Sequence, residues 1–216
     1  LSACMTLQEQ LHVPCSAVKS GDIVLNRAHY EQRYSKPLVI APSRSGQTSE
    51  TLIALEMFRQ RYHSRVLGLV EYDGAKILEY SDMALAFPWA NERSVCQTRS
   101  FSTLYLGMVA IAAVVGGDAG LLESLAEYVE RCDALAGQVD KQVRRMLADF
   151  PAWRSLVALG SGKQYGVVIE GAYIAIEMAA LPAHYFGTLE WRHGPIVLSN
   201  AEHLVCLTSA GEDARA

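Results

Sequence analysis

The sequence lacks the features that mark several common classes of protein. Its 216 residues include no lysine- or arginine-rich run and carry a formal net charge of −4, so little positive charge is available to neutralise a nucleic acid or an anionic membrane. The longest apolar run, Leu104 to Gly117, has about 14 residues, whereas a membrane-spanning helix needs roughly 20, so we expect a buried core helix there. No basic segment precedes an apolar stretch near the N-terminus, as it would in a secretion signal. We therefore expect a cytoplasmic protein with neither a nucleic acid nor a membrane as partner.

The five cysteines show no spacing typical of a metal or redox site. Their number is odd, they lie far apart, and none belongs to a C-x-x-C pair. We expect reduced thiols that mostly pack in the interior, and neither a metal nor a cofactor. The cysteines are Cys4, Cys15, Cys96, Cys132 and Cys206.

Two partial glycine motifs also differ from known nucleotide-binding sites. Residues 160–164 resemble part of a P-loop, but the spacing is wrong and Gln164 stands where a magnesium-binding serine or threonine is needed. Gly160, Gly162 and Gly166 miss the dinucleotide fingerprint by one residue, and no acidic residue follows at the distance that would hold a ribose. We therefore do not expect a nucleotide at this place.

A hydroxyl-rich segment from Pro42 to Thr51 is the most informative feature of the chain. It follows a short apolar run and opens an apolar-periodic helix, whose first turn offers unpaired N–H groups and the positive end of the helix dipole. An ordinary helix cap needs one hydroxyl, whereas this segment has five. We therefore favour a site for the phosphate of a small molecule. The predicted binding residues are Ser43, Arg44, Ser45, Gly46, Gln47 and Thr48, of which Gly46 lets the backbone approach a ligand closely and Arg44 is equally compatible with a solvated flank.

The hydrophobic pattern predicts an α/β fold. Half of the residues are hydrophobic (50%), so the chain can bury the core of one large or two small domains. Short apolar runs alternate with amphipathic segments between residues 10 and 90, as in a parallel sheet covered by helices. The predicted strands of this part are Val13–Val18, Pro37–Pro42, Ser64–Val70 and Met83–Pro88, and the predicted helices are 75–80 and 49–62, the latter burying Leu52, Ile53, Leu55, Met57 and Phe58.

The second half repeats a strand, a loop and a helix after a long helical connection. Helices are predicted over residues 97–115 and 121–148, and Phe150-Pro151 should end the second of them. A strand over 156–159, a helix over 165–181, a strand near His184 and a strand over 203–208 follow.

Four ordered motifs resemble the double-SIS (sugar isomerase domain) phosphosugar isomerases. They are the hydroxyl-rich segment, Glu92 to Phe101, Ile169 to Glu177, and Gly187 to Pro195, and they span nearly the whole chain. Within this family, the chain resembles the tagatose-6-phosphate ketose/aldose isomerase-like group and the isomerase half of glucosamine-6-phosphate synthase. The resemblance implies two SIS lobes, each a parallel sheet of flavodoxin-like order flanked by helices.

The resemblance also implies domain boundaries. We expect a first lobe over residues 1–118, a helical connection over 119–150 and a second lobe over 151–216. The family has a central strand and a glycine-rich turn before the position of Leu1, and further strands after the position of Ala210. We therefore expect a partial chain in which both lobes are incomplete.

The roles of the site residues come from the same resemblance. The serine-rich loop would hold the phosphate of a hexose phosphate, and Glu177 would be the base that moves a proton between C2 and C1 through an enediol. His193 would help to open the sugar ring and would reach the site from a neighbouring subunit of a homodimer or higher oligomer. Glu170, on the same helical face as Glu177, is a candidate for holding either a sugar hydroxyl or groups of the second subunit. Judged without the family, Glu177 fits the solvated edge of a helix and His193 fits a turn histidine bound by backbone carbonyls.

Several functions stay open on these residues. Ile174 stands where synthase-like members have lysine, and no glutaminase domain is present, so glutamine-dependent amination is not expected. An isomerase, a deaminase and a deglycase of a phosphorylated amino sugar all fit. The alternative is a noncatalytic sugar-phosphate sensor, since SIS folds also serve as effector-binding modules. A sensor would not need both Glu177 and His193, and we find no helix-turn-helix with a basic face.

Overall fold

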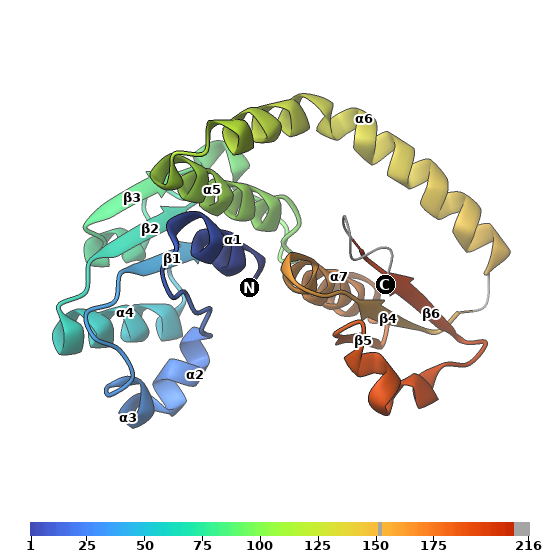
Figure 1. Ribbon diagram of the computed structural model, residues 1–216, viewed down its shortest axis with the longest axis horizontal. Coiled ribbons are helices and arrows are strands. Elements are labelled where there is room, and N and C mark those ends of the chain that lie inside the picture. Colours follow the sequence, from blue (N-terminus) through green and yellow to red (C-terminus); the bar gives the residue numbers. More distant parts are fainter. Residues whose placement is uncertain (151–152, 210–216) are drawn as a thin grey trace. The chain divides into compact units, whose positions relative to one another are not determined.

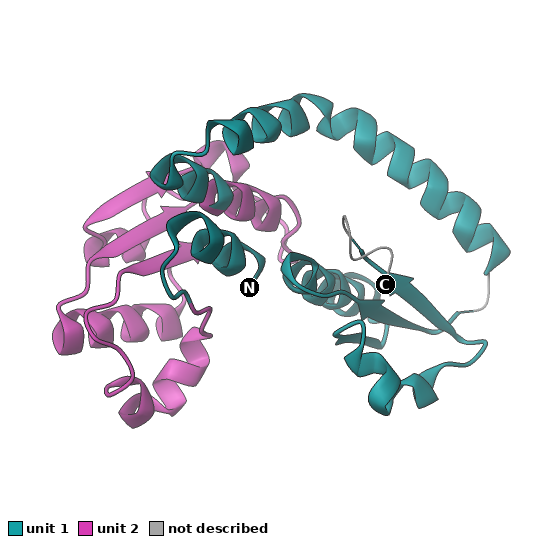
Figure 2. Ribbon diagram, viewed as in Figure 1, with its two compact units in different colours: residues 1–15, 109–216 teal, residues 16–108 magenta. Residues whose placement is uncertain are grey.

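The computed structural model describes residues 1–150 and 153–209, which form two compact units. One unit comprises residues 16–108, and the other comprises residues 1–15 together with 109–216 (Figure 2). Each unit contains one parallel sheet flanked by helices, so the predicted α/β class with two parallel sheets is confirmed. The domain boundaries near residues 118 and 150 and the incompleteness of both lobes stay predictions.

The unit of residues 16–108 contains a three-stranded parallel sheet in the order β1-β2-β3 (Figure 1). Val39 of β1 pairs with Val66 of β2, and Leu67 of β2 pairs with Met83 of β3. All three strands lie within the ranges predicted from the sequence, apart from Ser43 at the end of β1. The elements are α2 (Ser20–Leu25), α3 (Arg27–Tyr30), β1 (Val39–Ser43), α4 (Ser49–Tyr62), β2 (Val66–Val70), the 3₁₀ segment η1 (Lys76–Tyr80), β3 (Met83–Ala86) and the 3₁₀ segment η2 (Pro88–Ala90).

Helix α4 has the predicted bounds and joins two hydrophobic clusters. Met57 and Phe58 pack with residues of α2 and α3, and Leu55 packs with β1, β2 and η1. The prediction that Ile53 is buried was wrong, since its side chain is 47% exposed. Around the helix, Met57, Ala54, Phe58 and Leu55 span an arc of about 160°, and Ile53 lies about 40° beyond the Met57 edge of this arc.

The predicted strand Val13–Val18 was wrong. Residues 13–19 form no strand, and neither sheet includes them. Pro14 has no N–H to donate to a sheet, and Val13 is exposed. Val18 instead packs against the cluster of Ile23, Tyr30 and Phe58, so the apolar residues of this segment cover a helical core.

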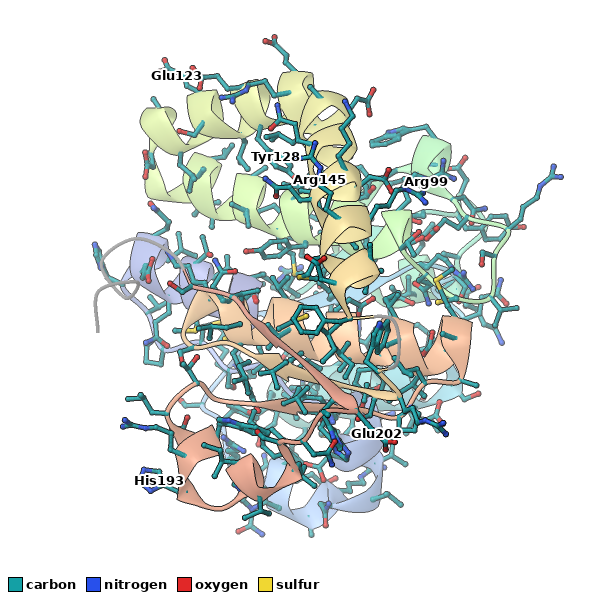
Figure 3. All side chains as sticks on the ribbon, turned by 90° about the vertical axis from the view of Figure 1, so that its right-hand side faces the viewer. Arg99, Glu123, Tyr128, Arg145, His193 and Glu202 are labelled. Atoms are coloured by element: carbon teal, nitrogen blue, oxygen red, sulfur yellow. The ribbon has the colours of Figure 1, made fainter. Side chains whose placement is uncertain are left out.

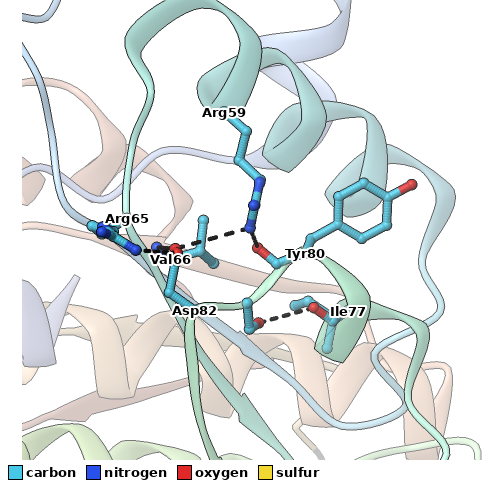
Figure 4. Close-up of polar contacts among 7 residues, drawn as sticks. Arg59, Arg65, Val66, Ile77, Tyr80 and Asp82 are labelled. Carbon is cyan, nitrogen blue, oxygen red and sulfur yellow. Dashed lines mark hydrogen bonds and ion pairs between the residues drawn. The ribbon is translucent and has the colours of Figure 1, made fainter.

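An aspartate fixes the amino ends of β2 and β3 in this unit (Figure 4). The Asp82 carboxylate accepts hydrogen bonds from the Val66 N–H (2.8 Å) and from Arg65 (2.7 Å), while Arg59 donates to the Tyr80 carbonyl (2.6 Å). The backbone hydrogen bond from Val66, followed by that from Arg65, lowers the pKa of Asp82. The carboxyl ends of the same strands lie at the opposite edge of the sheet, where α/β proteins bind ligands.

The other unit contains the sheet β5-β4-β6, also parallel. Its first strand lies in the centre, so the order by sequence is 2-1-3, as at the start of the flavodoxin-like order. Every predicted strand and helix from residue 156 onward is confirmed within two residues. The elements are α1 (Ser2–Leu11), α6 (Ala119–Asp149), β4 (Ser155–Leu159), α7 (Lys163–Ala179), β5 (Ala183–Phe186), the 3₁₀ segments η3 (Glu190–His193) and η4 (Pro195–Leu198), and β6 (His203–Leu207).

Helices α5 (Arg99–Gly116) and α6 separate the two sheets along the chain. Among the described residues, α5 alone is long and apolar enough to cross a membrane by length and composition, a criterion that core helices of soluble proteins also meet. Leu104, Val109 and Ala112 of α5 are buried in the protein, whereas Val115 is exposed. Helix α6 ends before Phe150, and Pro151, which was expected to end it, lies outside the described residues.

Candidate functional site

The hydroxyl-rich segment forms the loop between β1 and α4, at the carboxyl edge of its sheet. Gly46, at its centre, is buried and has a φ of 60°, a left-handed conformation that glycine adopts without strain. A Cβ atom at this position would lie 2.5 Å from the Ala75 Cβ and 2.7 Å from the Ile77 Cγ2. The Gly46 carbonyl accepts a hydrogen bond from the Ile77 N–H (2.9 Å). The loop is therefore seated directly on η1, and only glycine fits its centre.

Two serine hydroxyls stabilise the loop from within. Ser43 Oγ accepts a hydrogen bond from the Gly46 N–H (3.0 Å), and Ser45 Oγ accepts one from the Gln47 N–H (3.3 Å). Thr48 is the N-cap of α4, and its side chain makes no capping hydrogen bond. Ser45, Gln47 and Thr48 are exposed. The loop thus presents hydroxyl and amide groups beside the positive end of the α4 dipole.

Arg44 connects this loop to the segment before α5. Its guanidinium donates to the Ser94 carbonyl (2.6 Å), and its own carbonyl accepts a hydrogen bond from the Glu71 N–H (3.1 Å). Arg99, at the start of α5, donates to the carbonyls of Ala90 (3.1 Å) and Asn91 (2.9 Å). Both arginines therefore brace the loops at this edge of the sheet.

Glu92 caps the N-terminus of α5. Its carboxylate accepts hydrogen bonds from the backbone N–H groups of Thr98 (3.0 Å) and Ser100 (2.8 Å) and from the Thr98 hydroxyl (2.9 Å). Burial opposes ionisation, but the hydrogen bonds from Ser100 and Thr98 outweigh it and lower the pKa of Glu92 to about 2. The motif Glu92 to Phe101 therefore forms a turn that is fixed by hydrogen bonds, at the same edge of the sheet as the hydroxyl-rich loop.

Glu71 follows β2 at this edge and was missed in the sequence. Its side chain is completely buried, and Glu71 Oε2 accepts a hydrogen bond from the Ser100 hydroxyl (2.6 Å). A single glutamate after an apolar strand gives no periodic signal. Its position is the only indication: Glu71 follows β2, and β2 pairs with β1, the strand that leads into the hydroxyl-rich loop.

The two candidate carboxylates Glu170 and Glu177 lie on α7, in the other unit. They are two helical turns apart and therefore share a face. Glu170 is partly buried, and burial, followed by repulsion from Glu177, raises the pKa of Glu170. Glu177 is exposed. The face thus pairs a partly buried carboxyl group, whose pKa is raised, with an exposed one.

His193 ends the 3₁₀ segment η3 and is exposed at the surface of its unit (Figure 3). The segment is held by Trp191, which is buried and lies 5.6 Å from the Phe186 ring between centroids. Gly194, with a φ of 140°, then turns the chain into η4 in a conformation that is open to glycine. Because Trp191 is buried, it fixes this turn, and His193 lies exposed at the end of it.

The predicted site residues thus form two groups. Ser43 to Thr48 share one loop in the unit of residues 16–108, and Glu170, Glu177 and His193 lie in the other unit. Within the second group, the two glutamates share a helix and the histidine follows β5. Their roles in binding and catalysis stay predictions.

Comparison with known proteins identifies similar chains across nearly the full length. The glutamine–fructose-6-phosphate aminotransferase (isomerizing) of Shewanella oneidensis is 24% identical over 220 residues, which cover 99% of this chain and 36% of the relative. The crystal structure of glucosamine-6-phosphate deaminase from Thermotoga maritima superimposes with a TM-score of 0.89 at 25% identity, over 100% of this chain and 65% of that one. The predicted resemblance to SIS phosphosugar proteins is confirmed. No family model matches the chain.

The SIS-like fold extends to further solved structures. Tagatose-6-phosphate ketose/aldose isomerase from Escherichia coli superimposes with a TM-score of 0.78 at 24% identity, over 96% of this chain and 59% of that one, and so shares the fold. The chain spans about a third of the length of the curated relatives (36% and 34%) and about two thirds of the deaminase (65%). The hydroxyl-rich loop, the Glu92 turn and α7 all lie within the part of the chain that the deaminase structure covers.

Proposed function

We propose that this SIS-like chain binds a hexose phosphate and catalyses an enediol-type proton transfer, as a ketose/aldose isomerase or an amino-sugar-phosphate deaminase. The observation that carries the proposal is the loop Ser43–Thr48, with its buried left-handed glycine and its hydroxyl groups at a helix N-terminus. The named activities of the similar proteins, an isomerizing aminotransferase, a deaminase and an isomerase, support the same class of substrate.

The phosphate would lie on the loop between β1 and α4. Phosphate oxygens accept hydrogen bonds, and the hydroxyls of Ser45 and Thr48 are exposed beside the first turn of α4. The N–H groups of Gly46 and Gln47 are bound by serine hydroxyls in the free loop, and a phosphate would take these hydrogen bonds over. The positive end of the α4 dipole favours the negative charge.

The chemistry would be carried by α7 and the His193 turn. Glu177, as a carboxylate, would take the proton from one of the carbons C1 and C2 and return it to the other, with an enediol between the two steps. Glu170, which shares a face of α7 with Glu177, would hydrogen-bond a sugar hydroxyl. His193 would move the proton between ring oxygen and anomeric hydroxyl that opens the sugar ring. Ile174 leaves α7 without a lysine at the position where synthase-like members have one, which favours isomerase or deaminase over aminotransferase.

The activity is tested by proton exchange with solvent. The chain is incubated in heavy water with ketose and aldose 6-phosphates, including amino sugars, and the sugars are examined by NMR. We expect deuterium at C1 or C2, since an enediol exchanges its proton with solvent. Tight binding of a sugar phosphate with no deuterium in any sugar would favour the noncatalytic sensor.

We also propose a homodimer or higher homo-oligomer in which His193 reaches the site of a neighbouring subunit. Support comes from α6, which has no buried side chain among the described residues and carries an exposed apolar stripe. Such a stripe on a 31-residue helix is typical of an interface between subunits. Its most exposed members are Tyr128, Val129, Val139 and Val143.

The oligomer is tested by complementation. Glu177→Gln and His193→Ala variants, each strongly impaired alone, should regain part of the activity when unfolded together and refolded, because mixed oligomers contain sites with both native groups. Light scattering of the unmodified chain should give at least twice the mass of one chain. An active monomer would contradict the proposal.

A further inference from the structure

Glu71 connects three segments at the carboxyl edge of the sheet. Its N–H donates to the Arg44 carbonyl in the hydroxyl-rich loop (3.1 Å), and its Oε2 accepts a hydrogen bond from the Ser100 hydroxyl in the first turn of α5 (2.6 Å). The Ser100 N–H in turn donates to Glu92, the cap of α5 (2.8 Å). A continuous chain of hydrogen bonds therefore runs from the loop through Glu71 to the N-terminus of α5.

The second oxygen of the Glu71 carboxyl group has no partner. The side chain is 0% exposed, and Oε1 is buried without a hydrogen bond. A buried charged oxygen without a partner is far more costly than a buried neutral one. Burial raises the pKa of Glu71, the hydrogen bond from Ser100 opposes this, and the nearby carboxylate of Glu92 adds to it. The guanidinium groups of Arg99 and Arg44 act in the opposite direction.

We propose that Glu71 is a positioning residue of the hydroxyl-rich loop: as a neutral carboxylic acid it fastens Arg44 to the first turn of α5, and its ionisation weakens anion binding by the loop. The proposal rests on the proposed function, in which this loop holds the phosphate. It adds a regulation that the phosphate-binding residues alone do not provide, because the affinity would respond to pH through a group that never touches the ligand.

Two physical effects lead to this dependence. An ionised Glu71 would place a negative charge at the edge where the anion binds, and like charges repel more strongly away from bulk water. It would also draw the nearby arginines toward itself, including Arg44, whose contact with the Ser94 carbonyl orders the loop. Binding and titration are reciprocal, so an anion that binds less well to the ionised form must raise the pKa of Glu71.

Sulfate is a suitable probe because it keeps its double negative charge between about pH 5 and about pH 9, a range that includes the raised pKa values of buried glutamates. The affinity for sulfate is measured across this range by amide chemical shifts for the unmodified chain, Glu71→Gln and Glu50→Gln. Glu71→Gln has nearly the same shape and stays neutral. Glu50→Gln is the matched control, since Glu50 is an exposed carboxylate in the first turn of α4.

We expect the unmodified chain to bind sulfate well at low pH and to lose about tenfold in affinity as the pH rises through the pKa of Glu71, the change that corresponds to a shift of one pKa unit. Glu71→Gln should lack this loss and match the low-pH affinity throughout. Glu50→Gln should keep the loss, because the buried contact is unchanged. The remaining titrating groups are common to all three chains, so the difference isolates Glu71.

A second readout follows Glu71 directly. The side-chain ¹³C signal that disappears in Glu71→Gln is titrated with and without sulfate, and sulfate should move its midpoint to higher pH. An unmoved midpoint, or equal pH profiles for the unmodified chain and Glu71→Gln, would overturn the role of Glu71 but would not contradict the phosphate loop. If a folded chain binds no sulfate at any pH, the phosphate loop fails, and this inference fails with it. The ¹³C titration uses the unmodified chain with sulfate and decides the question even if Glu71→Gln folds poorly.

Discussion

Glu177→Gln is expected to lower turnover of the sugar phosphate by about 10² to 10⁴, the usual contribution of a general base. Glutamine has the shape of glutamate and can still hydrogen-bond, but it cannot take the proton from carbon. The loss should appear in kcat, because the interaction acts mainly in the transition state. The affinity for the sugar phosphate should stay within about tenfold, since the phosphate loop supplies most of the binding.

Glu170→Gln should behave differently from Glu177→Gln. Burial and the neighbouring Glu177 raise the pKa of Glu170, and an amide of the same shape can still hydrogen-bond a sugar hydroxyl, the role proposed for Glu170. We therefore expect this variant to lose less than about tenfold in turnover, well below the loss of a general base. Glu123→Gln on α6 serves as the control for removing one surface carboxylate (Figure 3).

The result that would contradict the role of Glu177 is a variant that keeps more than about a tenth of the turnover, because a general base contributes more than that. Glu170 would then be the next candidate for the base. If both glutamates proved dispensable, the noncatalytic sugar-phosphate sensor would be the better description of this chain. Heavy-water exchange separates these cases, since a sensor binds the sugar phosphate without exchanging its carbon-bound protons.

The best-predicted parts of the fold are those in which several local signals agree. Helix α4 has the bounds predicted from the sequence, because its apolar period directly follows a run of hydroxyl residues. The strands on either side of α7 were located because each is a short apolar run next to a turn. The hydroxyl-rich loop lies where a strand meets a helix, as its sequence indicates.

The errors arose where packing with distant residues decides the outcome. Val13–Val18 has a strand-like pattern, but Val18 packs on a core formed by α2, α3 and α4, and no sheet accepts the segment. Ile53 fits an apolar helix pattern and yet lies outside the face that α4 buries. Glu71 could not be recognised because its environment comes from the Arg44 loop and from Ser100, both more than twenty residues away.

Gly46→Ala is expected to lower the free energy of unfolding by about 2 to 5 kcal/mol, from roughly 1 to 2 for a left-handed backbone with a side chain and roughly 1 to 3 for overpacking. The new methyl group would lie 2.5 Å from the Ala75 Cβ, an atom fixed by the backbone, and 2.7 Å from the Ile77 Cγ2. Either η1 or the loop must move, and the hydrogen bond between the Ile77 N–H and the Gly46 carbonyl would be strained. Denaturant unfolding measures the loss.

Two other glycines separate the cost of the left-handed backbone from the cost of overpacking. Gly117 has a φ of 72° with no atom within 4 Å of an added Cβ, so Gly117→Ala should lose only the backbone part, about 1 to 2 kcal/mol. Gly21 lies in α2 with free space around it, so Gly21→Ala should leave stability unchanged or raise it by up to about 1 kcal/mol. If Gly46→Ala loses no more than Gly117→Ala, the loop is not seated on Ala75 and Ile77 as described.

The same loop should distinguish stability from binding. Ser45→Ala combined with Thr48→Ala removes two exposed hydroxyls and one long, exposed hydrogen bond, that from the Gln47 N–H to Ser45 Oγ (3.3 Å), so the free energy of unfolding should change little. The affinity for a hexose phosphate, measured by calorimetry, should fall by at least about a hundredfold, because each hydrogen bond to a charged group contributes roughly 1.5 to 3 kcal/mol. Ser124→Ala on α6 is the matched control for an exposed serine.

Gly46→Ala should lose both stability and affinity, since it displaces the N–H groups of Gly46 and Gln47 from the β1–α4 turn. Unchanged affinity in the double variant, or a crystal with sulfate ordered only elsewhere, would show that the phosphate binds at another place.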